Sequence, residues 1–175
     1  MSDALIAVVG PSGAGKDTLM RAGVAAMPGI HLVRRVITRP SDNNSEDFES
    51  VSRTEFIRRR AAGNFILDWL AHGLHYGVPH PSGKGIWLMN LSRGVLREAA
   101  RAMPRLGVIH VTADPEVLMA RLAGRGRENA VDIASRIARD INLDATGLPV
   151  ITIDNSSDLA VAEAAFIAAV QEFLQ

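Results

Sequence analysis

The feature that most constrains this chain is a glycine-rich segment that directly follows the apolar run of residues 4–9. It reads Gly10, Pro11, Ser12, Gly13, Ala14, Gly15, Lys16, Asp17 and Thr18. The pattern G-x-x-x-x-G-K, between a predicted strand and a predicted helix, is typical of a loop that binds nucleotide phosphates. Glycines let backbone N–H groups turn towards phosphate oxygens, and the helix N-terminus adds partial positive charge. We therefore expect ATP phosphates here, with Lys16 reaching the β- and γ-phosphates.

Asp17 occupies the position at which this motif usually has the Ser or Thr whose hydroxyl binds Mg²⁺. Two interpretations remain open. The carboxylate could bind Mg²⁺, because a predicted strand ends at Asn90, which offers only an amide where an acid could have served the metal. Alternatively, Asp17 only complements the positive helix N-terminus, and Thr18 faces the α-phosphate.

The composition narrows the possible classes of protein. The 175 residues fit one domain over 1–175, and an apolar content of 47% is too high for a disordered chain. Lys plus Arg and Asp plus Glu both number 19, which argues against general affinity for nucleic acid. Lysine occurs only at Lys16 and Lys84, and this preference for arginine suits bidentate phosphate binding. The absence of cysteine excludes disulfides, thiolate zinc sites and a cysteine nucleophile.

The chain shows no signal-peptide pattern, and no apolar run approaches about 18 residues. We therefore expect a cytoplasmic protein without a membrane segment.

Buried strands alternate with helices along the chain, which predicts an α/β fold with a mostly parallel sheet covered by helices on both faces. Strands are expected at residues 4–9, 30–38, 65–69, 74–78, 86–89, 106–111 and 149–153. Helices are expected at residues 16–27, 52–62, 94–103, 114–122 and 158–174. Residues 41–50 are polar and acidic and are expected to form a loop. Side chains alternate along a strand, so Arg35 and Arg39 should face the same way, as suits an anion.

Several motifs together resemble the guanylate kinase branch of the nucleoside monophosphate kinases. They are GPSGAGK at 10–16, Ile37-Thr38-Arg39-Pro40, Val51-Ser52 with Phe56, residues 65–69, Tyr76-Gly77, and Arg121-Leu122 up to Arg127. The resemblance implies a P-loop kinase with an acceptor-binding region at 34–85 and an arginine-bearing lid at 124–131.

The departures from that branch fall where guanine would be read. Arg35 stands in place of a serine, Phe48 in place of a phosphate-binding tyrosine, and Val78 in place of a Ser or Thr. Asp68 matches the base-reading glutamate only with a one-residue shift. Because unpaired polar groups on a purine are costly, an acceptor other than GMP is favoured.

A narrower set of motifs is similar to the ribose 1,5-bisphosphate phosphokinases of phosphonate breakdown. These motifs are Lys16-Asp17, Arg35 to Arg39, His72 to Val78, Asn90 with Ser92-Arg93, and Gly124 to Asn129. The resemblance implies transfer of a phosphoryl group from Mg-ATP to ribose 1,5-bisphosphate, giving 5-phosphoribosyl 1-diphosphate.

The resemblance also implies roles for individual residues. Lys16 would hold the donor phosphates, and Arg121, Arg125, Arg127 and Arg136 would be candidates to stabilise the transferring phosphoryl group. Acceptor-binding candidates are Arg35, Arg39, Asp68, Tyr76 and Asn90. Asp68 and Asn90 could bond ribose hydroxyls or could only satisfy local backbone. Trp69 and Trp87 are expected to pack in the core or on a sheet face.

Two other functions remain open from the sequence. One is a kinase for GMP or another nucleoside monophosphate. The other is a non-catalytic guanylate-kinase-like module that holds a phosphoprotein, although such modules typically lose the donor-site residues that this chain retains.

Overall fold

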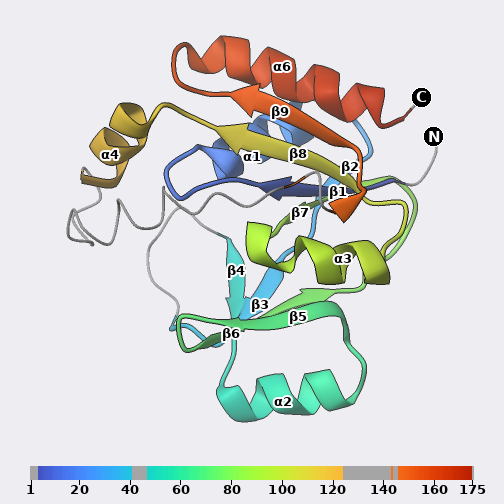
Figure 1. The fold of residues 1–175 in the computed structure, drawn as a ribbon. Coiled ribbons are helices and arrows are strands. Elements are labelled where there is room, and N and C mark those ends of the chain that lie inside the picture. Colours follow the sequence, from blue (N-terminus) through green and yellow to red (C-terminus); the bar gives the residue numbers. More distant parts are fainter. Residues whose placement is uncertain (1–3, 41–46, 124–142, 144–145, 175) are drawn as a thin grey trace.

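The computed structural model of the protein describes residues 4–40, 47–123, 143 and 146–174. Its main sheet has five parallel strands in the order β2-β7-β1-β8-β9 (Figure 1). The strands are β1 (Ala4–Val9), β2 (Ile30–Leu32), β7 (Ile86–Asn90), β8 (Gly107–Thr112) and β9 (Val150–Asp154). The predicted parallel α/β fold is confirmed, and it places the carboxyl ends of β1 and β7 side by side at one edge.

Helices cover both faces of the main sheet. They are α1 (Lys16–Ala26) and α6 (Leu159–Glu172) on one face, α3 (Leu96–Ala102) after the 3-10 turn η1 (Arg93–Val95) on the other, and α4 (Pro115–Ala123) near the end of β8. Gly23 of α1 lies against the buried ring of Phe166 in α6, where a Cβ would be only 3.0 Å from a ring carbon. The glycine inside α1 therefore allows these two helices to pack closely.

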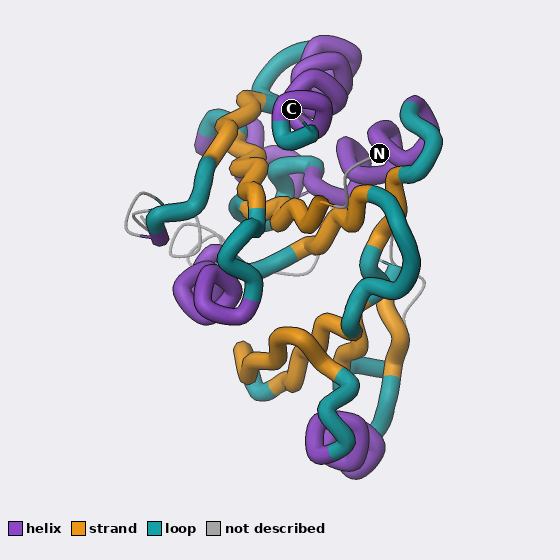
Figure 2. The backbone as a smooth tube through the Cα atoms, turned by 90° about the vertical axis from the view of Figure 1, so that its right-hand side faces the viewer, coloured by secondary structure: helices purple, strands orange, loops and turns teal. Residues whose placement is uncertain are grey.

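A second sheet of four strands lies beyond α3, away from α6 (Figures 1 and 2). Its strands are β3 (Arg35–Ile37), β4 (Phe48–Ser50), β5 (Phe65–Ala71) and β6 (Leu74–Pro79), in the order β4-β3-β6-β5. Helix α2 (Arg53–Ala61) covers the outer face of this sheet, and the inner face is turned towards the main sheet. Ser52 caps α2, because its Oγ accepts a hydrogen bond from the Glu55 N–H at 3.1 Å.

The prediction of one strand over 30–38 is wrong, because the chain crosses there from one sheet to the other. The Val33 N–H still donates to the Leu88 carbonyl of the main sheet at 2.9 Å. Two residues later Arg35 is paired with Phe48 in the second sheet. The sequence does not show this crossing, because the residues before it and after it both have the alternating pattern of a strand.

The prediction of a loop over 41–50 is wrong at its end. Residues 48–50 form β4, parallel to β3, and the Phe48 side chain is buried. Residues 41–46 lie outside the described residues. Phe48 is the apolar residue that anchors this edge strand, and the guanidinium carbon of Arg39 lies 4.3 Å from the centroid of its ring.

The hairpin β5–β6 decides which side chains face the main sheet. An irregularity in the pairing between Phe65 and Leu67 resets the alternation along β5. Phe65 stacks on Phe56 of α2 at 4.8 Å, so it faces outwards, whereas Leu67 packs in the core beside α3. From this shift Trp69 follows on the inner face and Asp68 on the outer face.

Within the described part of the chain, no helix is both long and apolar enough to cross a membrane.

Candidate functional site

The phosphate loop lies between the end of β1 and the start of α1, as the motif predicts. Gly10 has φ 148° and Gly15 has φ 92°, conformations that favour glycine. A Cβ at Gly10 would collide with the carbonyl oxygen of Val111, and one at Gly15 would collide with the side-chain amide of Asn155. Both glycines are therefore required by the space around the loop as well as by its conformation.

Lys16 lies across this loop. Its Nζ donates hydrogen bonds to the carbonyl oxygens of Gly10 at 3.0 Å and Pro11 at 3.1 Å. These carbonyls hold the ammonium group at the mouth of the loop, where a phosphate oxygen would compete for it.

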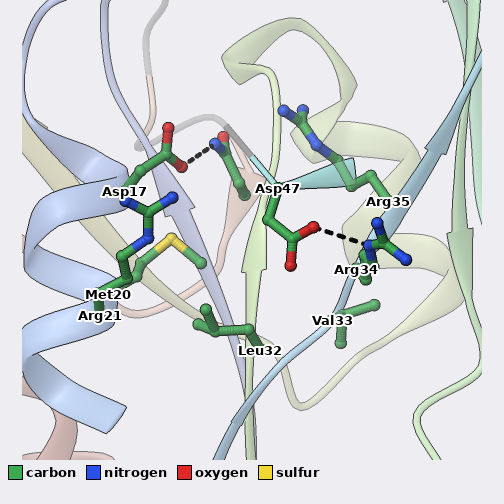
Figure 3. Close-up of a pocket in the computed structure, with 9 residues that line it drawn as sticks. Asp17, Met20, Arg21, Leu32, Val33, Arg34, Arg35 and Asp47 are labelled. Carbon is green, nitrogen blue, oxygen red and sulfur yellow. Dashed lines mark hydrogen bonds and ion pairs between the residues drawn. The ribbon is translucent and has the colours of Figure 1, made fainter. Parts of the chain in front are cut away.

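Asp17 and Asn90 are brought together from α1 and β7 (Figure 3). The Asn90 Nδ2 donates to Asp17 Oδ1 at 3.0 Å, so the amide orients the carboxylate. Within the described residues, no group of three or more His, Cys, Asp or Glu side chains could hold a metal ion. The donor set therefore fits a Mg²⁺ ion that takes one carboxylate from the protein and its other ligands from phosphate and water.

A cleft of about 410 Å³ joins the phosphate loop to the inner face of the second sheet. This volume is typical of sites for small molecules. The cleft is lined by Gly10, Pro11, Ser12, Gly13, Gly15, Lys16, Asp17, Thr18, Arg21, Arg35, Arg39, Trp69, Ala71, His72, Tyr76, Asn90, Leu91, Ser92, Arg93 and Gly94. The predicted ATP-binding residues are all present except Ala14, which is fully buried behind the loop.

The charges around the cleft are mostly positive. Five of the lining residues are basic and one is acidic; the basic ones are Lys16, Arg21, Arg35, Arg39 and Arg93. A cleft with this balance is suited to a ligand that carries several negative charges.

The same positive charge acts on His110 in β8. Burial lowers the pKa of His110 below its ordinary value, and the charges of Arg93 and Lys16 lower it further. Its Nε2 is buried and finds no hydrogen-bond partner in the part of the chain that the structure describes. His110 is therefore a neutral side chain beside a cation-rich site at pH 7.

Arg35 and Arg39 both line the cleft, as their spacing predicts, and an aromatic ring lies beside each. The guanidinium carbon of Arg35 lies 5.7 Å from the centroid of the Tyr76 ring, and Tyr76 stacks on Trp69 at 5.2 Å. The backbone at Arg39 is fixed by Ser50, whose Oγ donates to the Arg39 carbonyl at 2.6 Å. Two guanidinium groups are thus held on the face opposite the phosphate loop.

A smaller cavity of about 60 Å³ lies beside the cleft (Figure 3). It shares Asp17, Arg21, Arg35 and Asn90 with the cleft. The ion pair between Arg34 and Asp47, with Nε and Oδ1 at 2.8 Å, lies at this cavity.

Not all predicted site residues reach the cleft. Asp68 lies on the outer face of the second sheet, where its Oδ1 is 3.0 Å from the Arg60 Nε of α2. The irregularity before Leu67 is the reason, because it moves Asp68 to the face opposite Trp69. Arg121 does not line the cleft either; its guanidinium donates to the carbonyls of Gly13 at 3.3 Å and Asn155 at 2.9 Å.

The three remaining predicted arginines, Arg125, Arg127 and Arg136, lie outside the described residues, as does the predicted lid at 124–131.

Some residues at the cleft were not among the predicted site residues. Eight of them line it, namely Arg21, Trp69, Ala71, His72, Leu91, Ser92, Arg93 and Gly94, and a ninth, Asn155, lies behind the loop. Arg21 could have been found, because it is one helical turn after Asp17 on α1. Trp69 was expected to pack, and it does stack on Tyr76, but it also lines the cleft. Asn155 carries no local signal, since its contact with the loop joins residues 141 positions apart.

No protein-family model matches this chain. Curated proteins named ribose 1,5-bisphosphate phosphokinase PhnN are similar over most of its length. The protein from Brucella melitensis is 42% identical over 93% of this chain and 88% of its own, and that from Ruegeria is 47% identical over 90% and 86%. A bifunctional ribose 1,5-bisphosphokinase-thymidine phosphorylase from Cupriavidus necator is 43% identical over 94% of this chain but only 28% of its own length.

Among solved structures, guanylate kinase from Anaplasma phagocytophilum matches 99% of this chain and 88% of its own, with a TM-score of 0.70 and 18% identity. A gluconokinase from Sinorhizobium meliloti covers 97% of this chain and 92% of its own, with a TM-score of 0.56 and 14% identity. At these identities the structural matches bear on the fold alone.

Proposed function

The chain belongs to the family of ribose 1,5-bisphosphate phosphokinases, and on this premise we propose that it transfers the γ-phosphoryl group of ATP to ribose 1,5-bisphosphate, giving 5-phosphoribosyl 1-diphosphate and ADP. The observation that carries the proposal is the shared cleft. It joins a phosphate loop on one side to two arginines on the other, and among the described residues that line it Asp17 is the single acid. An acceptor that carries two phosphates and no base has the negative charge that this positively charged cleft would attract.

The donor site is formed by the phosphate loop. The N–H groups of the loop and the N-terminus of α1 would bind the ATP phosphates. Lys16 would exchange its present carbonyl partners, Gly10 and Pro11, for phosphate oxygens. This exchange is favourable because a charge-assisted bond to phosphate is stronger than one to a neutral carbonyl.

We assign the metal to Asp17. Its carboxylate, oriented by Asn90, would bind Mg²⁺ next to the phosphate loop. When bound, Mg²⁺ would neutralise negative charge on the β- and γ-phosphates.

The acceptor side is formed by the inner face of the second sheet. Arg35, Arg39 and Tyr76 would hold acceptor phosphate, and Asn90 would be available to a ribose hydroxyl. An oxygen of the 1-phosphate would bond to the γ-phosphorus while the bond from that phosphorus to the bridging oxygen of ADP breaks. Since phosphate esters have a second pKa near ~6, this oxygen is largely deprotonated at neutral pH and needs no strong general base.

Arg125, Arg127 and Arg136 remain proposed partners of the transferring phosphoryl group. Arg121 and Asp68 are left out of the reacting centre, because their side chains are bonded elsewhere in the structure. A cytoplasmic location, where ATP and sugar phosphates are found, is part of the same proposal.

The arrangement around the cleft favours a sugar phosphate over GMP as acceptor. Val78 is fully buried and apolar, and Asp68 is paired with Arg60 on the far side of the sheet. A guanine edge would therefore lose two polar partners, and unpaired polar groups of this kind are strongly rejected.

The test offers purified protein ATP and Mg²⁺ with ribose 1,5-bisphosphate, ribose 5-phosphate or GMP in separate reactions, and follows the products by phosphorus NMR. We expect a diphosphate product from the bisphosphate only. A diphosphate formed from GMP but not from the bisphosphate would overturn the proposal. Lys84→Met is a matched control for Lys16→Met, because the exposed Lys84 does not line the cleft and only Lys16→Met should abolish turnover.

A further inference from the structure

Two side chains hold the phosphate loop from behind. Arg121 of α4 donates to the carbonyl oxygens of Gly13 at 3.3 Å and Asn155 at 2.9 Å. Asn155 follows β9, and its Nδ2 donates to the Ala14 carbonyl at 2.8 Å. We call Arg121 and Asn155 the loop clamp. Arg121 bridges the carbonyls of Gly13 and Asn155, and the Asn155 side chain in turn bonds the Ala14 carbonyl.

Asn155 is built into this position. Only 2% of the residue is exposed, and its backbone N–H donates to the Thr112 carbonyl at 2.8 Å. Its Oδ1 is buried and has no hydrogen-bond partner among the described residues, and its Nδ2 is used for the bond to Ala14. Because the space behind Gly15 is filled by the Nδ2 group, only glycine can follow Ala14. A buried amide with one unpaired oxygen costs stability, which argues that the remaining bond has a role beyond packing.

The geometry of the peptide bond links this contact to the cleft. In a trans peptide the carbonyl and the following N–H point in opposite directions. When Asn155 holds the Ala14 carbonyl towards the back, the Gly15 N–H must point to the front. Gly15 lines the cleft and Ala14 does not, as this geometry requires.

We propose that Arg121 and Asn155 are positioning residues for the donor phosphates: by holding the Gly13 and Ala14 carbonyls, they aim the N–H groups of the loop at the phosphate chain. This assignment rests on the proposed function only in taking ATP as the donor. It replaces the expected catalytic role of Arg121, because the guanidinium group bonds the backbone carbonyls of Gly13 and Asn155. The energetic reason is preorganisation, since a loop whose amides are already aimed need not be ordered when phosphate binds.

The clamp is tested with inorganic tripolyphosphate, which has the phosphate chain of ATP without its base or sugar. Binding to the full chain is measured by calorimetry, next to that of ATP. Asn155→Asp keeps the shape of the side chain but removes the donor towards Ala14, and Arg121→Lys keeps the charge but cannot reach two carbonyls as a fork. We expect each to weaken both ligands by about 10- to 100-fold, as misplaced binding groups do. In kinetics the KM for ATP should rise by a similar factor while the KM for the acceptor stays within twofold.

Ser156→Ala is the matched control. Ser156 lies next to Asn155, and its Oγ accepts from the Asp114 N–H at 2.8 Å without contact to the loop. The control should bind tripolyphosphate like the unmodified protein. The Asn155→Asp and Arg121→Lys effects should also be less than additive in the double variant, because Arg121 holds the backbone of Asn155 and the two residues hold neighbouring peptide groups of the loop.

The outcomes separate this proposal from the proposed function. If the unmodified protein binds neither tripolyphosphate nor ATP, the donor site itself is wrong and the proposed function falls with it. If it binds both and the two variants bind as tightly, the loop clamp is overturned and the proposed function stands. A loss of ATP binding with tripolyphosphate binding intact would also overturn the clamp, since it would indicate a contact with the base. If one variant does not fold, as judged by circular dichroism, the other decides.

Discussion

Asp17 is the single residue at which this phosphate loop differs most in chemistry from the usual motif. The sequence left open whether its carboxylate binds Mg²⁺ or only complements the helix N-terminus. The bond from Asn90 orients the carboxylate within the cleft and favours the metal-binding interpretation, because a carboxylate that only complemented the helix N-terminus would not need this partner.

Asp17→Asn is therefore expected to raise the Mg²⁺ concentration needed for half-maximal activity by about tenfold or more, the range seen when groups around a metal are lost. Asp17→Ser, which restores the usual hydroxyl, should recover part of the effect. The measurement is initial rate against Mg²⁺ at fixed ATP. An unchanged magnesium requirement in Asp17→Asn would support the helix-terminus interpretation instead.

His110 gives a second prediction at this scale. Its folded pKa is lowered by burial and by Arg93 and Lys16, so the unfolded chain, with a pKa of about 6.5, takes up the proton first. Stability should therefore fall as pH drops below about 6.5, until the folded pKa is also passed. His110→Gln should show a smaller loss of melting temperature between pH 7 and pH 5.5 than the unmodified protein.

Bound tripolyphosphate should raise the pKa of His110, because its negative charge offsets Arg93 and Lys16. An NMR titration of the imidazole with and without the ligand checks this. A midpoint that stays the same would contradict the placement of phosphate near these two cations.

At the level of elements, the irregularity in β5 and the packing of helix α2 decide which side chains of the second sheet face the cleft. Phe56 of α2 is fully buried, stacks on Phe65 at 4.8 Å and lies tilted against the His75 ring at 5.2 Å between centroids. Gly77 leaves room for the Phe65 ring, since a Cβ there would be 2.7 Å from it. Packing on the outer face thus fixes the hairpin whose inner face carries Trp69 and Tyr76.

Phe56→Ala should cost about 3–5 kcal/mol in the free energy of unfolding, the usual range for removing a buried phenyl group. Ile57→Ala, on the same helix but 51% exposed, should change it by no more than about 0.5 kcal/mol. Denaturant unfolding measures both. If the two variants are equally stable, α2 is not the support of this sheet.

The elements also show how far the sequence predicts the structure. The main sheet and the α2 cap follow from local signals, namely buried runs and the spacing of Ser52 and Glu55. The crossing after Leu32 has no such signal, because a strand in either sheet has the same alternation of side chains. Asp68 was predicted for the acceptor site, but an irregularity in strand pairing puts it on the other face of the sheet. Asn155 was missed, because it bonds a residue 141 positions away.

At the level of the whole molecule, the proposed donor and acceptor groups come from different sheets, which Figure 2 shows as separate layers. The phosphate loop follows β1 of the main sheet, whereas Arg35 begins β3 of the second sheet and Arg39 lies just after that strand. The two halves of the proposed site should therefore respond separately to substitution.

Arg35→Met is expected to raise the KM for the bisphosphate by about 10- to 100-fold, the value of one charge-assisted hydrogen bond. Tripolyphosphate affinity should stay within twofold. Arg53→Met, at an exposed position of α2 outside the cleft, serves as the control for lost positive charge. Equal losses of donor and acceptor affinity in Arg35→Met would contradict the division of the site between the two sheets.

The second sheet also has a distinctive place in the chain. The chain leaves the main sheet after β2 and returns at β7, and these two strands are direct neighbours, with Ile30 beside Ile86. The Ile86 N–H even bonds the Gly29 carbonyl at 2.9 Å, so the excursion begins and ends at almost the same point. Residues 33–85 therefore form a cassette whose replacement leaves every neighbour relation in the main sheet intact. Exchange of this cassette between related kinases would therefore be a route by which the same ATP-binding sheet comes to act on new acceptors.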